Sequence, residues 1–146
     1  MKNKKQPMNP QSGLSLLEVV VVVIIIAGIL ALVGPNIFKQ YTQSQARNTK
    51  SQIELLSTAL DTFRLEIGRY PTEEEGLQAL VAQPEGLGLW NGPYLRKKTL
   101  PRDGWGNEFV YANPPVQGGI DYDLSSLGAD GKPGGAENDK DIGNWE

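Results

Sequence analysis

An apolar run of twenty residues near the N-terminus constrains this chain more than any other feature of its sequence. The run extends from Leu14 to Val33, and Glu18 is the only charged residue within it. A twenty-residue α-helix is about 30 Å long, which matches the thickness of the hydrocarbon core of a bilayer. The run therefore predicts a single transmembrane helix at residues 14–34.

The charges on either side of the run predict the orientation of this helix. Lys2, Lys4 and Lys5 precede it without any acid, and the next basic residue is Lys39. Because the positively charged flank of a transmembrane helix stays in the cytoplasm, we expect a single-pass protein of the inner membrane with its C-terminal domain in the periplasm. A removable secretory signal peptide has the same order of charged and apolar residues, but no convincing A-x-A cleavage site follows this run.

The acid inside the run is a candidate functional residue. A carboxylate within a membrane segment costs a few kcal/mol unless it has a partner. Glu18 could instead lie at the level of the lipid headgroups, where the positive end of the helix dipole favours an acid. The nearest place for a compensating cation is the α-amino group that a cut just before Leu14 would create.

The residues around Glu18 resemble the prepilin class III signal. The sequence GLSLLE (13–18) leads directly into the apolar run. In that family the prepilin peptidase cuts after the Gly, methylates the new first residue and leaves a Glu at the fifth position. The resemblance implies a cleaved leader at residues 1–13, a cut between Gly13 and Leu14, methylation of Leu14, and a role for Glu18 in assembly. The family usually has Phe where this chain has Leu14.

The composition excludes several classes of site. The chain has no Cys and no His, which removes disulfides, Cys/His zinc sites and catalytic pairs that need either residue. Its 14 basic and 17 acidic residues give a formal net charge of −3, so we expect no nucleic acid partner. A metal site would have to use oxygen ligands, which favours calcium or magnesium.

Helical periodicity continues beyond the apolar run. Residues 36–67 contain no Gly or Pro, and apolar residues recur at spacings of three and four: Ile53, Leu56, Leu60, Phe63 and Ile67. This spacing predicts one apolar face that packs on a core, with the helix continuing to about residue 67. The first half of so long a helix would need lipid or other copies of the chain to cover it.

The segment after Gly68 is rich in Gly and Pro and predicts short elements joined by loops. Thr72 can cap a short helix whose inward side carries Leu77, Leu80 and Val81. Residues 108–113 and 119–126 alternate as strands do, which predicts an antiparallel pair, optionally with a third short strand. Residues 35–146 are therefore expected to form one α+β domain.

Three further segments resemble the major pseudopilins of type II secretion, the G-type subunits of the type IV pilin-like superfamily. DGWGNEFVYANP (103–114) is close to the family pattern D-P-W-G-N-P-[YF]-x-Y, with Gly104 and Glu108 in place of the two prolines. GRYPTEEEGLQAL (68–80) and the C-terminal segment from Tyr122 also match. The resemblance implies a pilin-like fold in which a long N-terminal helix packs on a small antiparallel sheet, followed by a calcium-binding loop.

The same resemblance implies a structural subunit and no enzyme. Such a subunit forms a homopolymer, the periplasmic pseudopilus, which moves folded exoproteins across the outer membrane. The implied partners are the prepilin peptidase, minor pseudopilins, an inner-membrane platform with its cytoplasmic ATPase and, indirectly, the secretin and the exoproteins. The alternatives are a type IV or competence pilin, against which the absence of cysteines argues, and a membrane-anchored periplasmic enzyme that uses loop carboxylates as acid and base.

Four acids lie among glycines near the C-terminus: Asp130, Glu137, Asp139 and Asp141. Carboxylates that share a site repel one another unless a cation lies between them. Calcium accepts six to eight oxygen ligands in flexible geometry, whereas magnesium requires stricter octahedral order. The spacing is not that of an EF-hand. A solvated acidic tail remains the alternative to a calcium site.

The family resemblance implies particular ligands in this loop. It assigns the carboxylates of Asp130, Glu137 and Asp139 and the carbonyl of Leu127, with the carbonyl of Ser125 as a further candidate. Glu137 departs from the family, which usually has Asp there. Asp141 and Trp145 are expected to shape and anchor the loop rather than to bind the metal.

Overall fold

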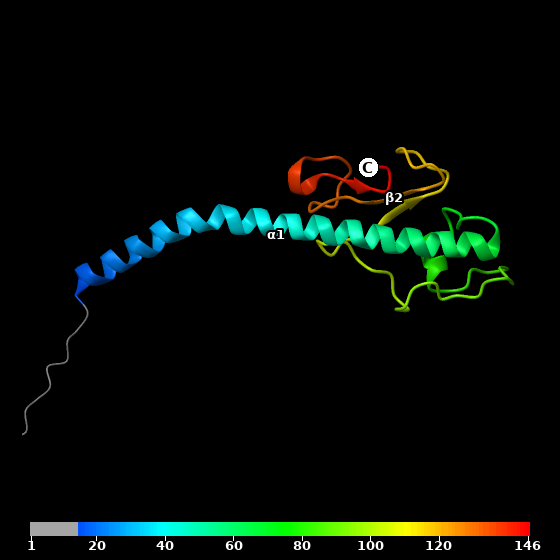
Figure 1. Ribbon diagram of the computed structural model, residues 1–146, viewed down its shortest axis with the longest axis horizontal. Coiled ribbons are helices and arrows are strands. Elements are labelled where there is room, and N and C mark those ends of the chain that lie inside the picture. The colour runs from blue at the N-terminus through cyan, green and yellow to red at the C-terminus, as the bar shows by residue number, and fades with distance from the viewer. Residues whose placement is uncertain (1–14) are drawn as a thin grey trace, which may run out of the picture. The chain divides into compact units, whose positions relative to one another are not determined.

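The computed structural model describes residues 15–146. It divides into a unit that ends at Lys39 and a C-terminal unit, Gln40–Glu146, and the two units are described separately below. The described elements follow one another along the chain (Figure 1) as α1 (Leu16–Ile67), the 3-10 helix η1 (Leu77–Leu80), β1 (Val110–Ala112), β2 (Asp123–Ser126), the 3-10 helix η2 (Glu137–Asp139) and β3 (Ile142–Gly143).

The helix ends where the sequence predicts. Its last residue is Ile67, and the N–H of Gly68 donates a hydrogen bond of 2.7 Å to the carbonyl of Arg64. Gly and Pro are absent from residues 36–67, so nothing in that stretch interrupts the backbone hydrogen bonds of the helix.

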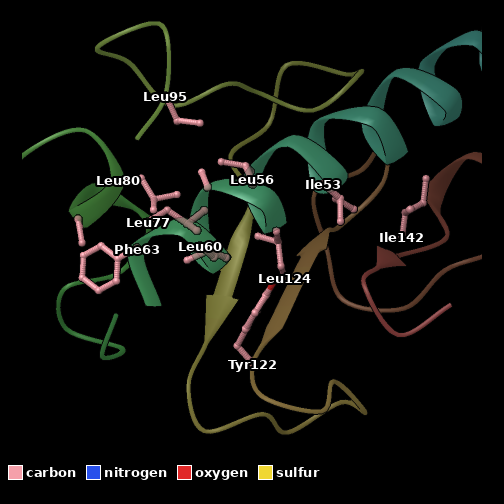
Figure 2. Close-up of a cluster of buried hydrophobic side chains, with 12 residues drawn as sticks. Ile53, Leu56, Leu60, Phe63, Leu77, Leu80, Leu95, Tyr122, Leu124 and Ile142 are labelled. Carbon is pink, nitrogen blue, oxygen red and sulfur yellow. The ribbon is translucent and has the colours of Figure 1, made fainter. Parts of the chain in front are cut away.

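The predicted apolar face of α1 forms the core of the C-terminal unit. Ile53, Leu56, Leu60 and Phe63 are buried, and Ile67 packs at the edge of the cluster. Figure 2 shows the four buried residues of α1 in one cluster with side chains from the rest of this unit, namely Leu77, Leu80, Leu95, Tyr122, Leu124 and Ile142. The prediction of one buried helix face is therefore confirmed.

The sheet has three strands in the order β1-β2-β3, and both pairs are antiparallel. Val110 pairs with Ser125 across β1 and β2, and Ser126 pairs with Ile142 across β2 and β3. The predicted antiparallel pair is thus confirmed, and β3 is a third short strand beside it. In Figure 1 the C-terminal segment, in red, lies beside β2.

Both predicted strands are shorter than expected, and the Asp123 side chain explains the later start of β2. The carboxylate of Asp123 accepts backbone N–H groups from Val116, Gln117 and Gly119. These amides fold the preceding residues around the acid as a loop, so Gly119 belongs to this loop rather than to a strand. Asp123 is 4% exposed, and such burial requires hydrogen bonds of this kind.

The segment predicted as a short capped helix forms a turn that leads into η1. Thr72 and Glu75 cap it reciprocally: the Glu75 N–H donates to the Thr72 hydroxyl at 3.2 Å, and the Thr72 N–H donates to the Glu75 carboxylate at 2.8 Å. Arg69 donates two hydrogen bonds to the same carboxylate, at 2.6 and 2.7 Å. Arg69 is the main reason that the pKa of Glu75 falls to about 2, so the cap is ionised at neutral pH.

Candidate functional site

The first candidate site is the start of α1. Glu18 lies in the first turn of the helix and is exposed. No salt bridge within residues 15–146 involves it. Gly13 and Leu14, where the sequence predicts cleavage and methylation, lie outside the described residues, as does the leader at 1–13.

The apolar residues that follow Glu18 are unusually exposed. Large aliphatic side chains between Leu16 and Val33 are 45% to 84% exposed. By its length and composition, α1 is long and apolar enough to cross a membrane. An apolar surface of this size on a single chain needs lipid or protein to cover it.

The second candidate site is the acidic loop, which we define as residues 127–141 between β2 and β3. Asp130 and Glu137 are exposed in it, and Asp139 is half-buried. The Lys132 N–H donates to the Asp130 carboxylate at 3.0 Å. In the described part of the chain no three acidic side chains gather closely enough to hold a metal. The structure therefore does not bring the predicted carboxylates together.

The fourth acid of this loop is in a different environment from the others. One carboxylate oxygen of Asp141 accepts the Gly134 N–H at 2.9 Å. Its other oxygen, Oδ1, is buried, and among residues 15–146 it is the one buried side-chain oxygen or nitrogen atom without a hydrogen-bond partner. Sequence reasoning assigned Asp141 an anchoring role alone, although it lies in the same run of acids as the predicted ligands.

The predicted backbone ligands lie at the end of β2, where the acidic loop begins. Ser125 is buried and Leu127 is half-buried.

At the other end of the loop, Lys140 donates to the carboxylate of Glu146 at 2.7 Å, and Lys50 of α1 lies 3.4 Å from the same carboxylate. These two lysines, Lys140 foremost, lower the pKa of Glu146.

Trp145 lies against the glycine of β3. A Cβ atom at Gly143 would come within 2.5 Å of the Trp145 indole ring. Trp145 is half-buried.

The comparisons with known proteins point to one family. Residues 36–145 match the family model described as type II secretion system (T2SS), protein G. Several relatives bear the name type II secretion system core protein G, and two of them illustrate the match. The one from Pseudomonas aeruginosa is 44% identical over 140 residues, which cover 93% of this chain and 96% of the relative. The one from Vibrio cholerae is 39% identical, with 94% of each chain covered.

A solved structure agrees with these sequence matches. It is the crystal structure of the major pseudopilin from the type 2 secretion system of enterohaemorrhagic Escherichia coli, with a TM-score of 0.61 and 35% sequence identity. The match covers 76% of this chain and 95% of that one. The fold, the family match and the relatives together favour a secretion subunit over a type IV pilin or an enzyme. This chain belongs to the protein G family of type II secretion systems and is a structural pseudopilin.

Proposed function

We propose that copies of this protein polymerise into a periplasmic pseudopilus that moves folded exoproteins across the outer membrane. The observation that carries this proposal is the exposed apolar surface of α1 between Leu16 and Val33. Before assembly this surface lies in the inner membrane as a single-pass anchor, with the C-terminal unit in the periplasm. In the filament the same surface packs against neighbouring copies, since a repeated head-to-tail contact that does not close generates a fibre.

Glu18 specifies how neighbouring copies pair. In an assembled apolar core its carboxylate needs an opposite charge, because an unpaired buried charge is strongly unfavourable. The methylated α-amino group of Leu14 on an adjacent copy supplies that charge. The family resemblance implies the proposed partners, which are the prepilin peptidase, minor pseudopilins, an inner-membrane platform with a cytoplasmic ATPase and, indirectly, the secretin and the exoproteins.

Processing at Gly13 is a condition for this pairing and can be measured directly. We expect mass spectrometry of the protein from membranes to find a chain that begins at Leu14 and carries one added methyl group. The uncut chain has no amino group near Glu18, so it could not form the pair. An intact N-terminus at Met1 in the assembled protein would contradict the proposal.

We also propose that the acidic loop binds calcium. Asp130, Glu137 and Asp139 supply carboxylates and Leu127 supplies a carbonyl, after a local rearrangement that brings these groups together. The buried Oδ1 atom of Asp141 supports a cation here, because a buried carboxylate oxygen without a partner is costly. Calcium would neutralise the mutual repulsion of these acids and fold the loop around itself.

Calcium is expected to raise the melting temperature of the protein lacking residues 1–38. A ligand that binds the folded state alone stabilises it by about 2.7 kcal/mol at one hundred times its dissociation constant. Calorimetric melting in calcium and in EDTA measures the effect, and Asp139→Asn should reduce it. Identical melting temperatures in calcium and in EDTA would remove the calcium proposal.

A further inference from the structure

The loop that follows η1 is tied back to this helix at two points. The indole N–H of Trp90 donates to the Ala79 carbonyl at 2.7 Å, and the backbone N–H of Tyr94 donates to the Leu80 carbonyl at 2.8 Å. The rings of Trp90 and Tyr94 also contact each other edge to face, with centroids 5.8 Å apart. Residues 91–93 therefore lie between two aromatic residues that are both held in place.

The indole of Trp90 leaves no room for a side chain at position 92. A Cβ atom on Gly92 would come within 2.5 Å of the indole Cζ2 atom and 2.8 Å of Cε2. The ring cannot move aside without weakening its hydrogen bond to Ala79. The structure thus requires glycine here, and glycine, which has no Cβ atom, gives its own backbone nitrogen the least hindered approach to the residue before it.

The residue before Gly92 is an exposed asparagine, Asn91. Its backbone N–H donates to the Tyr94 hydroxyl at 3.3 Å. Within residues 15–146, neither the side-chain amide of Asn91 nor the N–H of Gly92 has a hydrogen-bond partner. No hydrogen bond therefore keeps the Gly92 nitrogen and the side-chain carbonyl carbon of Asn91 apart.

The other asparagines of the C-terminal unit are in different surroundings. Asn107, Asn113 and Asn144 each donate a side-chain hydrogen bond to a backbone carbonyl, at 2.9, 2.9 and 3.1 Å. The residues that follow these three are Glu, Pro and Trp. The remaining two, Asn48 and Asn138, lie within α1 and η2. Asn91 alone in this unit combines a following glycine with a side chain that no hydrogen bond holds.

We propose that Asn91 is a site of spontaneous deamidation in the folded protein, with water as the co-reactant. Asparagine is one of the chemically unstable residues of proteins. The Gly92 nitrogen attacks the side-chain carbonyl carbon of Asn91, a new C–N bond closes a succinimide ring, and the amide nitrogen leaves as ammonia with the proton from Gly92. Water then adds to one of the two ring carbonyls and breaks its C–N bond, which gives aspartate or isoaspartate without any oxidation or reduction.

Both products change the loop at its junction with α1. Each replaces a neutral amide with a carboxylate, so the chain gains one negative charge. Isoaspartate also adds a backbone carbon between Trp90 and Tyr94, whose anchors on η1 are adjacent residues. The longer backbone disturbs the hydrogen bond from Asn91 to the Tyr94 hydroxyl, which itself donates to the Glu66 carboxylate of α1 at 2.8 Å.

The test follows the full chain, purified in detergent, in warm and mildly alkaline buffer with and without urea. Peptide mapping by mass spectrometry measures conversion at each asparagine. We expect conversion at Asn91 in the folded protein to be within about fivefold of its rate in urea, the factor of one net hydrogen bond. Asn107 and Asn144 should be slowed by more than about fivefold in the folded protein, because their side-chain bonds must break first.

Asn91→Gln is the matched control, since its longer side chain would have to close a larger ring and should keep its amide. The proposal is overturned if Asn91 keeps its amide in both conditions, or if folding slows its conversion by more than that factor. Equal rates with and without urea at Asn107 and Asn144 would also overturn it, because hydrogen bonding would then not select the site. The same mass change in the Asn91→Gln peptide would place the reaction at another residue. None of these results depends on calcium or on assembly.

Discussion

Replacing Glu18 with glutamine is expected to abolish assembly of the pseudopilus while the C-terminal unit stays folded. Glutamine has nearly the same shape but no charge, so the amino group of Leu14 on the neighbouring copy would be left unpaired in an apolar core. Removing one partner of a buried ion pair costs about 3–5 kcal/mol, and a filament repeats that cost at every subunit. The measurement is the amount of pseudopilus that can be sheared from cells and detected by immunoblot.

Three controls make this result specific. Glu85→Gln removes an exposed acid from the C-terminal unit and should leave assembly intact. Glu18→Asp keeps the charge on a shorter side chain and should retain part of the assembly. Mass spectrometry should find Glu18→Gln cut before Leu14, because the defect lies after processing. Pseudopili of Glu18→Gln in the normal amount would refute the charge pairing.

Replacing Phe63 with alanine should cause the largest loss of stability in the C-terminal unit. The Phe63 side chain is 0% exposed and its ring contacts that of Tyr94 edge to face, with centroids 5.5 Å apart. Truncating a buried phenylalanine costs about 3–5 kcal/mol, which is a large part of the stability of about 5–15 kcal/mol that domains of this size have. Urea unfolding of the protein lacking residues 1–38 measures the change.

Leu65 offers a matched comparison two residues away on the same helix. Its side chain is 86% exposed, so Leu65→Ala should change the free energy of unfolding by no more than about 0.5 kcal/mol. Equal shifts of the urea midpoint in Leu65→Ala and Phe63→Ala would mean that the buried face of α1 has been assigned wrongly.

The elements that the sequence predicted well are those with a regular period. The buried face of α1 and its end at Ile67 follow from apolar spacing and from the absence of Gly and Pro, both of which are local properties. The antiparallel pair of β1 and β2 follows in the same way from alternation. The start of β2 could not be predicted in this way, because it depends on the Asp123 side chain, which binds three backbone amides of the preceding loop.

The candidate site in the acidic loop was likewise only partly predictable from the sequence. The acids of the loop were visible in the sequence as a run among glycines, but their separation in space was not. The unpartnered oxygen of Asp141 depends on which donors the fold places around it. The bond from Asn107 to Gly128 joins residues 21 positions apart, and nothing in the spacing of either segment predicts it.

By itself, the sequence determined the membrane-length helix, the apolar face that builds the core and the pairing of the main strands, because each depends on residues that are neighbours along the chain. Only the tertiary structure decided which buried polar groups find partners and where the acids of the loop lie. Those outcomes depend on hydrogen bonds between segments that are far apart in the sequence. Local sequence patterns do not predict such long-range contacts.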